Sequence, residues 1–308
     1  MKKILITPRS FAKTDDAPKK LLQDAGYELV VNPYGTILTK EQMLAHVADA
    51  VGVILGVDPF DADVFAAAKQ LKAIAKYGVG TDNIDLSAAK SRGIPVSITR
   101  GANSNAVADY AFALVMACAR RLTVVNDMCH RRDWKKVVVG DVYGKTIGIL
   151  GLGAIGKGVA KRAKGFDMQI LAYDIYWDDA FAQANGIRKA TPEEIYRSCD
   201  FISLHMPLTD ETKNMVDAKA FGMMKKGAVL VNTARGGLVD EAALIAALRD
   251  GTLSGAGIDA FNEEPPANEE LYKLDNLIMG SHCGASTTGA SEAMSMMAAK
   301  YLLADLAD

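Results

Sequence analysis

The stretch KTIGILGLGAIGKGVAKRAKGFDMQILAYD, residues 145–174, decides the fold that we expect for this chain. Thr146 to Leu150 is a short apolar run, typical of a buried parallel strand. Gly151, Gly153 and Gly156 follow in the spacing G-x-G-x-x-G, and a helical stretch comes next. Such a turn brings a helix N-terminus, with its unpaired N–H groups, close to a pyrophosphate. The stretch therefore predicts a dinucleotide-binding unit rather than an ordinary glycine turn.

An acidic residue completes this unit. Gln169 to Tyr173 forms its second strand, and Asp174 comes directly after that strand. A carboxylate at this place accepts hydrogen bonds from the ribose hydroxyls of the adenosine, and it disfavours a 2′-phosphate. No arginine occurs in residues 175–179. The sequence therefore favours NAD over NADP.

Composition excludes several classes of protein. The chain has 308 residues, enough for two domains, half of them apolar, with a net charge of −2. We therefore expect no nucleic-acid partner and no membrane partner. The apolar run near the N-terminus is too short for a signal peptide. The four cysteines lack metal-ligand spacing and a disulfide framework, so we expect no metal site and a cytoplasmic location.

Strands and helices alternate along the chain, which predicts parallel sheets covered by helices on both faces. The first set of strands is expected at residues 3–7, 27–32, 52–55, 71–76 and 94–98. The second set is expected at 146–150, 169–173, 201–205, 228–232, 255–259 and 276–280. A largely apolar helix over 103–121 would connect the two sets, and a last helix over 291–306 would return to the first. The predicted fold class is α/β with two doubly wound parallel-sheet domains.

Three polar residues follow successive strands of the second set. They are Arg235, Glu264 and His282, and sites in open parallel sheets lie at these strand ends. A guanidinium suits a carboxylate, and an imidazole moves protons near neutral pH. Each residue also has an ordinary interpretation. Under it, Arg235 is a surface ion-pair partner, Glu264 is an exposed acid, and His282 is a histidine with a structural role only.

The remaining histidines compete with His282 for the role of acid–base. His46 lies in an ordinary helical stretch and His130 in a basic run, HRRDWKK. His205 ends a strand beside the expected cofactor and is the main rival. We favour His282 because it completes a set with an arginine and a glutamate.

The sequence resembles the D-isomer-specific 2-hydroxyacid dehydrogenases, and within them the phosphoglycerate dehydrogenase-like branch. The resemblance covers nearly the whole chain. It rests on the glycine turn and on KYGVGTDNID (76–85), LHMPLTDET (204–212), VNTARGGLVDE (231–241), GIDAFNEEPP (257–266) and SHCGASTTGASE (281–292).

The resemblance implies a role for each site residue. Arg235 would bind the substrate carboxylate, His282 would be the general acid–base, and Glu264 would be its partner. Backbone N–H groups of Val79 and Gly80 would also bind the substrate. The NAD site would include the three glycines of the turn together with Ala154, Ile155, Asp174, His205, Met206, Pro207, Thr233, Ala234, Asp259 and Gly284.

The resemblance also implies a division of the chain. Residues 1–99 with 287–308 would form a flavodoxin-like substrate domain, and residues 100–286 a Rossmann NAD-binding domain, with a cleft between them. The family further implies a homodimer built around the connecting helix. Trp134, in the basic run, is a candidate contact with the partner subunit.

The resemblance implies an enzyme that transfers hydride between NAD(H) and a small 2-oxo or 2-hydroxy acid, and the activity that we expect first is that of a D-3-phosphoglycerate dehydrogenase. The motif GASTTGASE favours D-3-phosphoglycerate, whereas phosphoglycerate dehydrogenases often carry an arginine where this chain has Gly56-Val57-Asp58. The alternatives are a hydroxypyruvate or glyoxylate reductase of the same family, and a non-enzymatic NAD(H)-sensing corepressor-type binding protein.

Overall fold

The computed structural model describes residues 1–307, and the chain forms two compact units. One unit contains residues 1–103 and the C-terminal segment from Ser286, and the other contains Ser104–Ala285. Both are built on wholly parallel sheets. The predicted α/β fold class with two doubly wound parallel sheets is confirmed.

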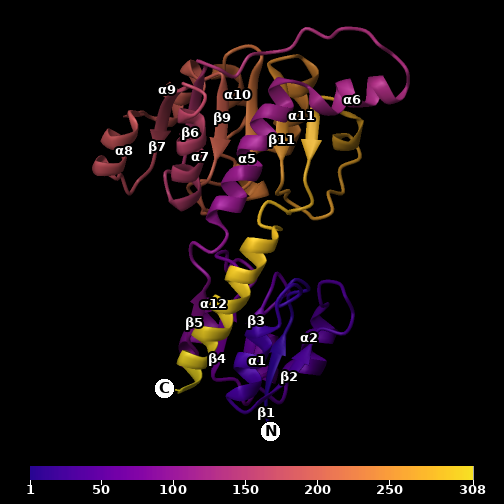
Figure 1. Ribbon diagram of the computed structural model, residues 1–308, viewed down its shortest axis with the longest axis vertical. Coiled ribbons are helices and arrows are strands. Elements are labelled where there is room, and N and C mark those ends of the chain that lie inside the picture. Colours follow the sequence, from indigo (N-terminus) through magenta and orange to yellow (C-terminus); the bar gives the residue numbers. More distant parts are fainter. Residues whose placement is uncertain (308) are drawn as a thin grey trace. The chain divides into compact units, whose positions relative to one another are not determined.

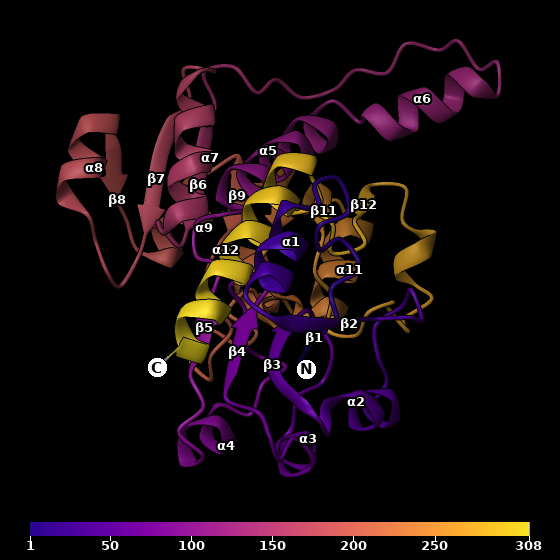
Figure 2. The ribbon, with the colours of Figure 1, turned by 60° about the horizontal axis from the view of Figure 1, so that its bottom comes forward.

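The sheet of the first unit has the strand order β2-β1-β3-β4-β5, the flavodoxin-like order. Its central strands are buried on both faces, as covering helices require, and Ile4, Leu5 and Ile6 have no exposed surface. Figures 1 and 2 show α12 lying beside α1, and Ala298 and Leu302 of α12 pack with Ile4 and Ile6. The elements are β1 (Lys2–Ile6), α1 (Ala17–Asp24), β2 (Tyr27–Val31), α2 (Lys40–Val47), β3 (Ala50–Leu55), α3 (Ala62–Ala67), β4 (Ala73–Lys76), α4 (Leu86–Ser91), β5 (Val96–Ile98) and α12 (Thr288–Ala307).

The sheet of the second unit has the order β12-β11-β10-β9-β6-β7-β8. Helices α5, α7 and α8 cover one face, and α9, α10 and α11 cover the other. The elements are α5 (Ser104–Ala119), α6 (Leu122–His130), β6 (Thr146–Leu150), α7 (Ala154–Lys164), β7 (Gln169–Tyr173), α8 (Asp179–Asn185), β8 (Ile187–Lys189), α9 (Pro192–Ser198), β9 (Phe201–Leu204), α10 (Ala218–Met223), β10 (Ala228–Asn232), α11 (Glu241–Arg249), β11 (Leu253–Ile258) and β12 (Leu277–Met279), with 3-10 turns at Gly236–Leu238 and Leu271–Lys273.

The strand order of the second unit predicts where a ligand binds. The order reverses between β6 and β9, because the chain first builds outward through β7 and β8 and then returns to the other side of β6. Ligands of open α/β sheets bind beyond the carboxyl ends of the strands at such a switch point. The glycine turn follows β6 directly, so it lies at this edge of the sheet.

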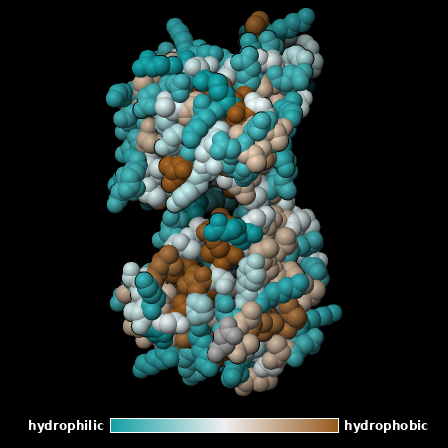
Figure 3. All heavy atoms as spheres, turned by 90° about the vertical axis from the view of Figure 1, so that its left-hand side faces the viewer, coloured by the Kyte–Doolittle hydropathy of each residue, from teal (hydrophilic) through white to brown (hydrophobic). Residues whose placement is uncertain are grey.

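The structure also differs from the sequence-based expectation in two elements. The helix expected over 103–121 ends at Ala119, and a separate helix, α6, begins at Leu122. The short strand β8, at the edge of the second sheet, was not expected. Within residues 1–307, no helix combines the length and the apolar character needed to cross a bilayer. Figure 3 shows mostly hydrophilic side chains on the drawn face of the second unit and several groups of hydrophobic side chains on that of the first.

Candidate active site

Two glycines of the turn, Gly151 and Gly156, pack tightly against other backbone atoms, whereas Gly153 is open. Gly151 has a φ of +99°, and a Cβ there would lie 2.6 Å from the carbonyl of His205. A Cβ on Gly156 would lie 2.0 Å from the Gly151 oxygen. At Gly153, by contrast, no atom of residues 1–307 beyond the immediate neighbours lies within 4 Å of the Cβ position. The turn therefore offers open backbone at the N-terminus of α7, where a pyrophosphate fits.

The carboxylate of Asp174 is held beside this turn. Its two oxygens accept hydrogen bonds from the N–H groups of Leu152, at 2.6 Å, and Tyr176, at 2.8 Å. A carboxylate oxygen accepts more than one hydrogen bond, so ribose hydroxyls can still bind there. Asp174 thus lies beside the glycine turn, and its binding of the adenosine ribose stays a prediction.

Two buried polar atoms at neighbouring strand ends have no hydrogen-bond partner among residues 1–307. They are Nδ1 of His205, after β9, and Oγ1 of Thr233, after β10. The other ring nitrogen of His205 lies 2.8 Å from Oγ of Ser203. Buried polar groups are nearly always satisfied in native proteins, so these two atoms indicate a polar ligand.

The site residues therefore fit a nicotinamide dinucleotide. The cofactor candidates all belong to the second unit. They lie after the strands or in the first turn of α7, and they are Gly151, Gly153, Ala154, Ile155, Gly156, Asp174, His205, Met206, Pro207, Thr233, Ala234, Asp259 and Gly284.

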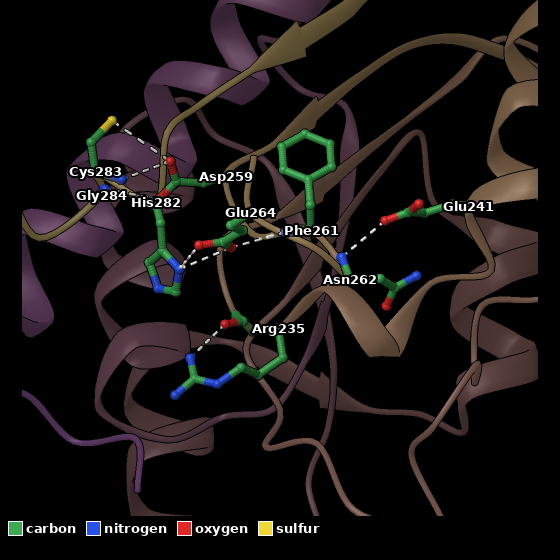
Figure 4. Close-up of polar contacts among 10 residues, drawn as sticks. Arg235, Glu241, Asp259, Phe261, Asn262, Glu264, His282, Cys283 and Gly284 are labelled. Atoms are coloured by element: carbon green, nitrogen blue, oxygen red, sulfur yellow. Dashed lines mark hydrogen bonds and ion pairs between the residues drawn. The ribbon is translucent and has the colours of Figure 1, made fainter. Parts of the chain in front are cut away.

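His282 and Glu264 form a hydrogen-bonded pair (Figure 4). Nδ1 of His282 lies 3.0 Å from each carboxylate oxygen of Glu264. The backbone N–H of Phe261 donates to Oε1 of Glu264 at 3.1 Å, which fixes the carboxylate. Because Nδ1 is engaged, Nε2 is the nitrogen left to exchange a proton with a substrate.

The pair shifts the pKa of both members. The hydrogen bond to Glu264 raises the pKa of His282 above its ordinary value, although burial and the charge of Arg235 act in the opposite direction. Burial alone would raise the pKa of Glu264, but the hydrogen bond and charge of His282, with the charge of Arg235, leave it below its ordinary value. The pair therefore favours an imidazolium beside a carboxylate.

Arg235 lies near this pair, in the loop after β10. Asn232, which is fully buried, donates to the Arg235 carbonyl at 2.8 Å and accepts from the Ala234 N–H at 3.0 Å, so the loop is fixed. Nη1 of Arg235 donates to the Ala234 carbonyl at 2.7 Å. In Figure 4 its guanidinium and the imidazole of His282 extend to the same side. Its charge reaches both His282 and Glu264.

The other histidines differ from His282 in their surroundings. Burial lowers the pKa of His205 to about 3, so its imidazole is neutral at physiological pH. The ring of His46 lies 3.3 Å from the hydroxyl of Tyr34, in the first unit. His130 is exposed at the end of α6. His282, by contrast, has a hydrogen-bonded carboxylate partner, Glu264, that supports its protonated form.

Other expectations concern residues outside this cluster. Val79 and Gly80 lie in the loop after β4 and belong to the first unit. Their role in binding the substrate stays a prediction. Glu263, expected as a solvated neighbour, is exposed.

The sequence did not single out Tyr110 and Cys283, which lie close to the site. The thiol of Cys283, the residue after His282, donates to the hydroxyl of Tyr110 at 3.4 Å. Tyr110 belongs to α5 and is distant from His282 in sequence. No motif contains both residues, so only the fold brings them together.

Known proteins resemble this chain over most of its length. The sequence model of the NAD-binding domain of D-isomer specific 2-hydroxyacid dehydrogenases matches residues 112–284, which include Arg235, Glu264 and His282. A glyoxylate reductase of Thermococcus litoralis is 43% identical over 281 residues, covering 88% of this chain and 83% of that protein.

Two further comparisons extend the range of related activities. A D-3-phosphoglycerate dehydrogenase of Methanocaldococcus jannaschii is 40% identical over 92% of this chain, but the match covers only 54% of that protein. The crystal structure of D-lactate dehydrogenase from Aquifex aeolicus, complexed with NAD and lactic acid, superposes with a TM-score of 0.85. It is 26% identical, and the match covers 98% of this chain and 94% of that one.

Proposed function

Because this chain belongs to the D-isomer specific 2-hydroxyacid dehydrogenase family, we propose that it reduces a small, unphosphorylated 2-oxoacid, with glyoxylate as the first candidate. The family makes it an NAD-dependent oxidoreductase that interconverts 2-oxo and 2-hydroxy acids. The observation that carries the proposal is the placement of Arg235, Glu264 and His282 together beyond neighbouring strands of the unit with the glycine turn.

The side chains divide the work of the reaction. Arg235 binds the substrate carboxylate through paired hydrogen bonds, which orients the carbonyl. The glycine turn and Asp174 would hold NADH, which would supply the hydride for the carbonyl carbon. His282 gives the proton on Nε2 to the carbonyl oxygen, and the product is the 2-hydroxyacid. Glu264 stabilises the imidazolium before the transfer, and the neutral imidazole then regains a proton from water. Oxidation follows the same path in reverse.

The loop after β3 supports an unphosphorylated substrate. Asp58 is 2% exposed, and its carboxylate accepts hydrogen bonds from the N–H of Leu38, at 2.7 Å, and from the hydroxyl of Thr7. This carboxylate is therefore engaged inside the first unit. Gly56-Val57-Asp58 also carries no cationic side chain that could bind a phosphate.

Phosphohydroxypyruvate is the second candidate, which would make the protein a D-3-phosphoglycerate dehydrogenase. The relative from Methanocaldococcus jannaschii and the motif GASTTGASE favour it. Lys76 is one cation near this loop, but it is buried, and its ammonium bonds to the Gly56 carbonyl and, at 3.1 Å, to the Asn83 side chain. These partners lower its capacity to bind a phosphate.

The test is a comparison of kcat/KM for NADH oxidation with glyoxylate, hydroxypyruvate, pyruvate and phosphohydroxypyruvate. We expect the highest values with the small unphosphorylated acids. A preference for phosphohydroxypyruvate of tenfold or more, about 1.4 kcal/mol, would move the assignment to the second candidate. NADH binding without turnover of any 2-oxoacid would instead favour the corepressor-type protein.

We also propose NAD as the preferred cofactor, a cytoplasmic location and a homodimer. Asp174, held beside the glycine turn, supports NAD over NADP. The four cysteines are unpaired, which fits a reducing compartment. The dimer is supported by α6 and the segment after it, which extend away from the sheet of their unit (Figure 1). Within residues 1–307, α6 buries none of its residues, and Trp134 is 82% exposed.

A further inference from the structure

A buried residue, Asp259, accepts hydrogen bonds from the backbone of the turn that contains His282. Asp259, which follows β11, is 2% exposed. Its carbonyl accepts from the N–H of His282 at 2.9 Å. Its carboxylate accepts from the N–H of Cys283 at 3.0 Å and from that of Gly284 at 2.8 Å. Three successive N–H groups thus donate to Asp259, one of them to its carbonyl and two to its carboxylate.

The turn needs such support because of its backbone conformation. His282 has a φ of +54°, in the left-handed region that non-glycine residues rarely adopt. Residues in this region persist only when their surroundings determine them. The backbone conformation of His282 sets the direction of its Cα–Cβ bond. It therefore also sets the direction in which the imidazole points.

The turn is also enclosed from the side of α5. A Cβ on Gly280 would lie 2.1 Å from Oδ1 of Asp259 and 2.7 Å from the hydroxyl of Tyr110. The Cys283 thiol has two acceptors within reach of its one proton, the same hydroxyl at 3.4 Å and Oδ1 of Asp259 at 3.6 Å. In the view of Figure 4, Asp259 and Cys283 lie on the side of His282 away from Arg235.

The loop that begins with Asp259 also carries Glu264. Asp259 therefore binds the backbone of His282 at one end of this loop, and Glu264 binds its imidazole at the other. A shift of the turn would lengthen the contacts between Nδ1 and the Glu264 oxygens. Glu264, Arg235 and Asp259 are the charged groups that face His282.

We propose that Asp259, supported by Cys283 and the hydroxyl of Tyr110, is a positioning residue that holds His282 against Glu264. The proposal rests on the acid–base role of His282 under the proposed function. It adds a second role for Asp259, which is also a candidate residue of the cofactor site. Tyr110 would act on the reaction through the turn, without touching the substrate.

The first measurement is the titration of His282 by proton NMR in the cofactor-free protein. The chain has four histidines, and a His282→Gln variant identifies the resonance. Asp259→Asn removes a charge that faces the imidazole as well as one acceptor, so it does not separate positioning from electrostatics. Tyr110→Phe does separate them, because the phenol is neutral and burial raises its pKa further.

We expect Tyr110→Phe to lower the pKa of His282 and to lower kcat about tenfold or more, while KM for NADH stays within about threefold, since small misplacements at a reacting centre are costly. Cys283→Ser should retain the wild-type behaviour, because a hydroxyl can donate to Tyr110. The matched control is Tyr196→Phe, which removes a buried hydroxyl that donates to the Met215 carbonyl at 3.1 Å, outside the His282 turn.

A double-mutant cycle gives the decisive result. If the turn acts by holding the imidazole on Glu264, adding Tyr110→Phe to Glu264→Gln changes the pKa of His282 no further. Additive effects, or an unchanged pKa in Tyr110→Phe, would overturn the proposal. A rise in KM for NADH alone would overturn it as well. The titration needs no substrate, so it decides this inference even if no 2-oxoacid is reduced.

Discussion

At the scale of single residues, the hydrogen-bonded pair of His282 and Glu264 would determine, under the proposed mechanism, which protonation states of the enzyme react. Reduction needs the imidazolium, because a proton must be given to the carbonyl oxygen, and oxidation needs the neutral ring. Glu264 raises the pKa of His282. Reduction should therefore persist to higher pH than an isolated histidine would allow.

Replacement of Glu264 by Gln tests this effect. The pKa of His282 should fall, so kcat/KM for reduction should begin to decline at lower pH than in the wild type. The onset of oxidation should move in the same direction. The measurement is a pair of pH profiles, with Glu263→Gln as the matched control because Glu263 is exposed beside it. Identical profiles for wild type and Glu264→Gln would contradict the assignment.

Arg235 should matter for the substrate and little for the cofactor. Arg235→Lys keeps the charge but loses the planar pair of donors. We expect a rise in KM for the 2-oxoacid equivalent to about 1.5–3 kcal/mol. The dissociation constant of NADH, measured by fluorescence, should stay within about threefold. Arg249→Lys, on the exposed side of α11, is the control. Equal losses of substrate and NADH binding would speak against this role.

At the scale of elements, the turn between β6 and α7 tolerates no side chain at its first glycine. Gly151→Ala should lower the free energy of unfolding by about 1–3 kcal/mol and weaken NADH binding, because Cβ would collide with the His205 carbonyl. Gly222→Ala in α10 is the control, since its Cβ position is open, and it should be neutral or slightly stabilising. Thermal unfolding and NADH titration measure both effects. Unchanged NADH binding by Gly151→Ala would argue against a cofactor at this turn.

Buried strands were the elements that the sequence predicted best. Residues 146–150, 169–173 and 228–232 match β6, β7 and β10, because continuous apolar runs bounded by glycine or polar residues are typical of such strands. The strand β8 was missed because it has three residues, two of them exposed and basic. The break before α6 was missed because Arg121 adopts a left-handed conformation without a glycine or proline to signal it.

The chemistry of the site was more predictable than its support. Arg235, Glu264 and His282 were selected because each follows a strand of one parallel sheet, and such strand ends lie at one edge. The structure shows these side chains close together, and their catalytic roles stay a prediction. The support of His282 by Asp259, Cys283 and Tyr110 was not predictable. It depends on a left-handed backbone at His282 and on the packing of α5, and neither leaves a pattern in sequence.

At the scale of the whole molecule, an exposed segment remains that the second unit does not bury. Leu122 is 54% exposed, Trp134 82% and Val138 98%. Large apolar side chains that are left exposed are candidates for protein–protein contacts. A second copy of the chain is the partner that we propose for it.

This proposal predicts a dimer that depends on Trp134 and Val138. The wild type should sediment as a dimer in analytical ultracentrifugation, and the combination of Trp134→Asp with Val138→Asp should shift it to monomer. Tyr176→Asp is the control, because Tyr176 is 85% exposed elsewhere in the same unit. A wild type that is monomeric at micromolar concentration, or a double variant that remains dimeric, would exclude this interface.

The most direct test of the central claim is the turnover of glyoxylate with NADH by His282→Gln, measured beside the wild type. We expect kcat to fall about 10²- to 10⁴-fold, because the proton donor to the carbonyl oxygen is lost. NADH affinity should be nearly unchanged, since the glycine turn and Asp174 remain intact. A variant that keeps kcat within about twofold of the wild type would show that another group protonates the substrate, and the assigned site would be wrong.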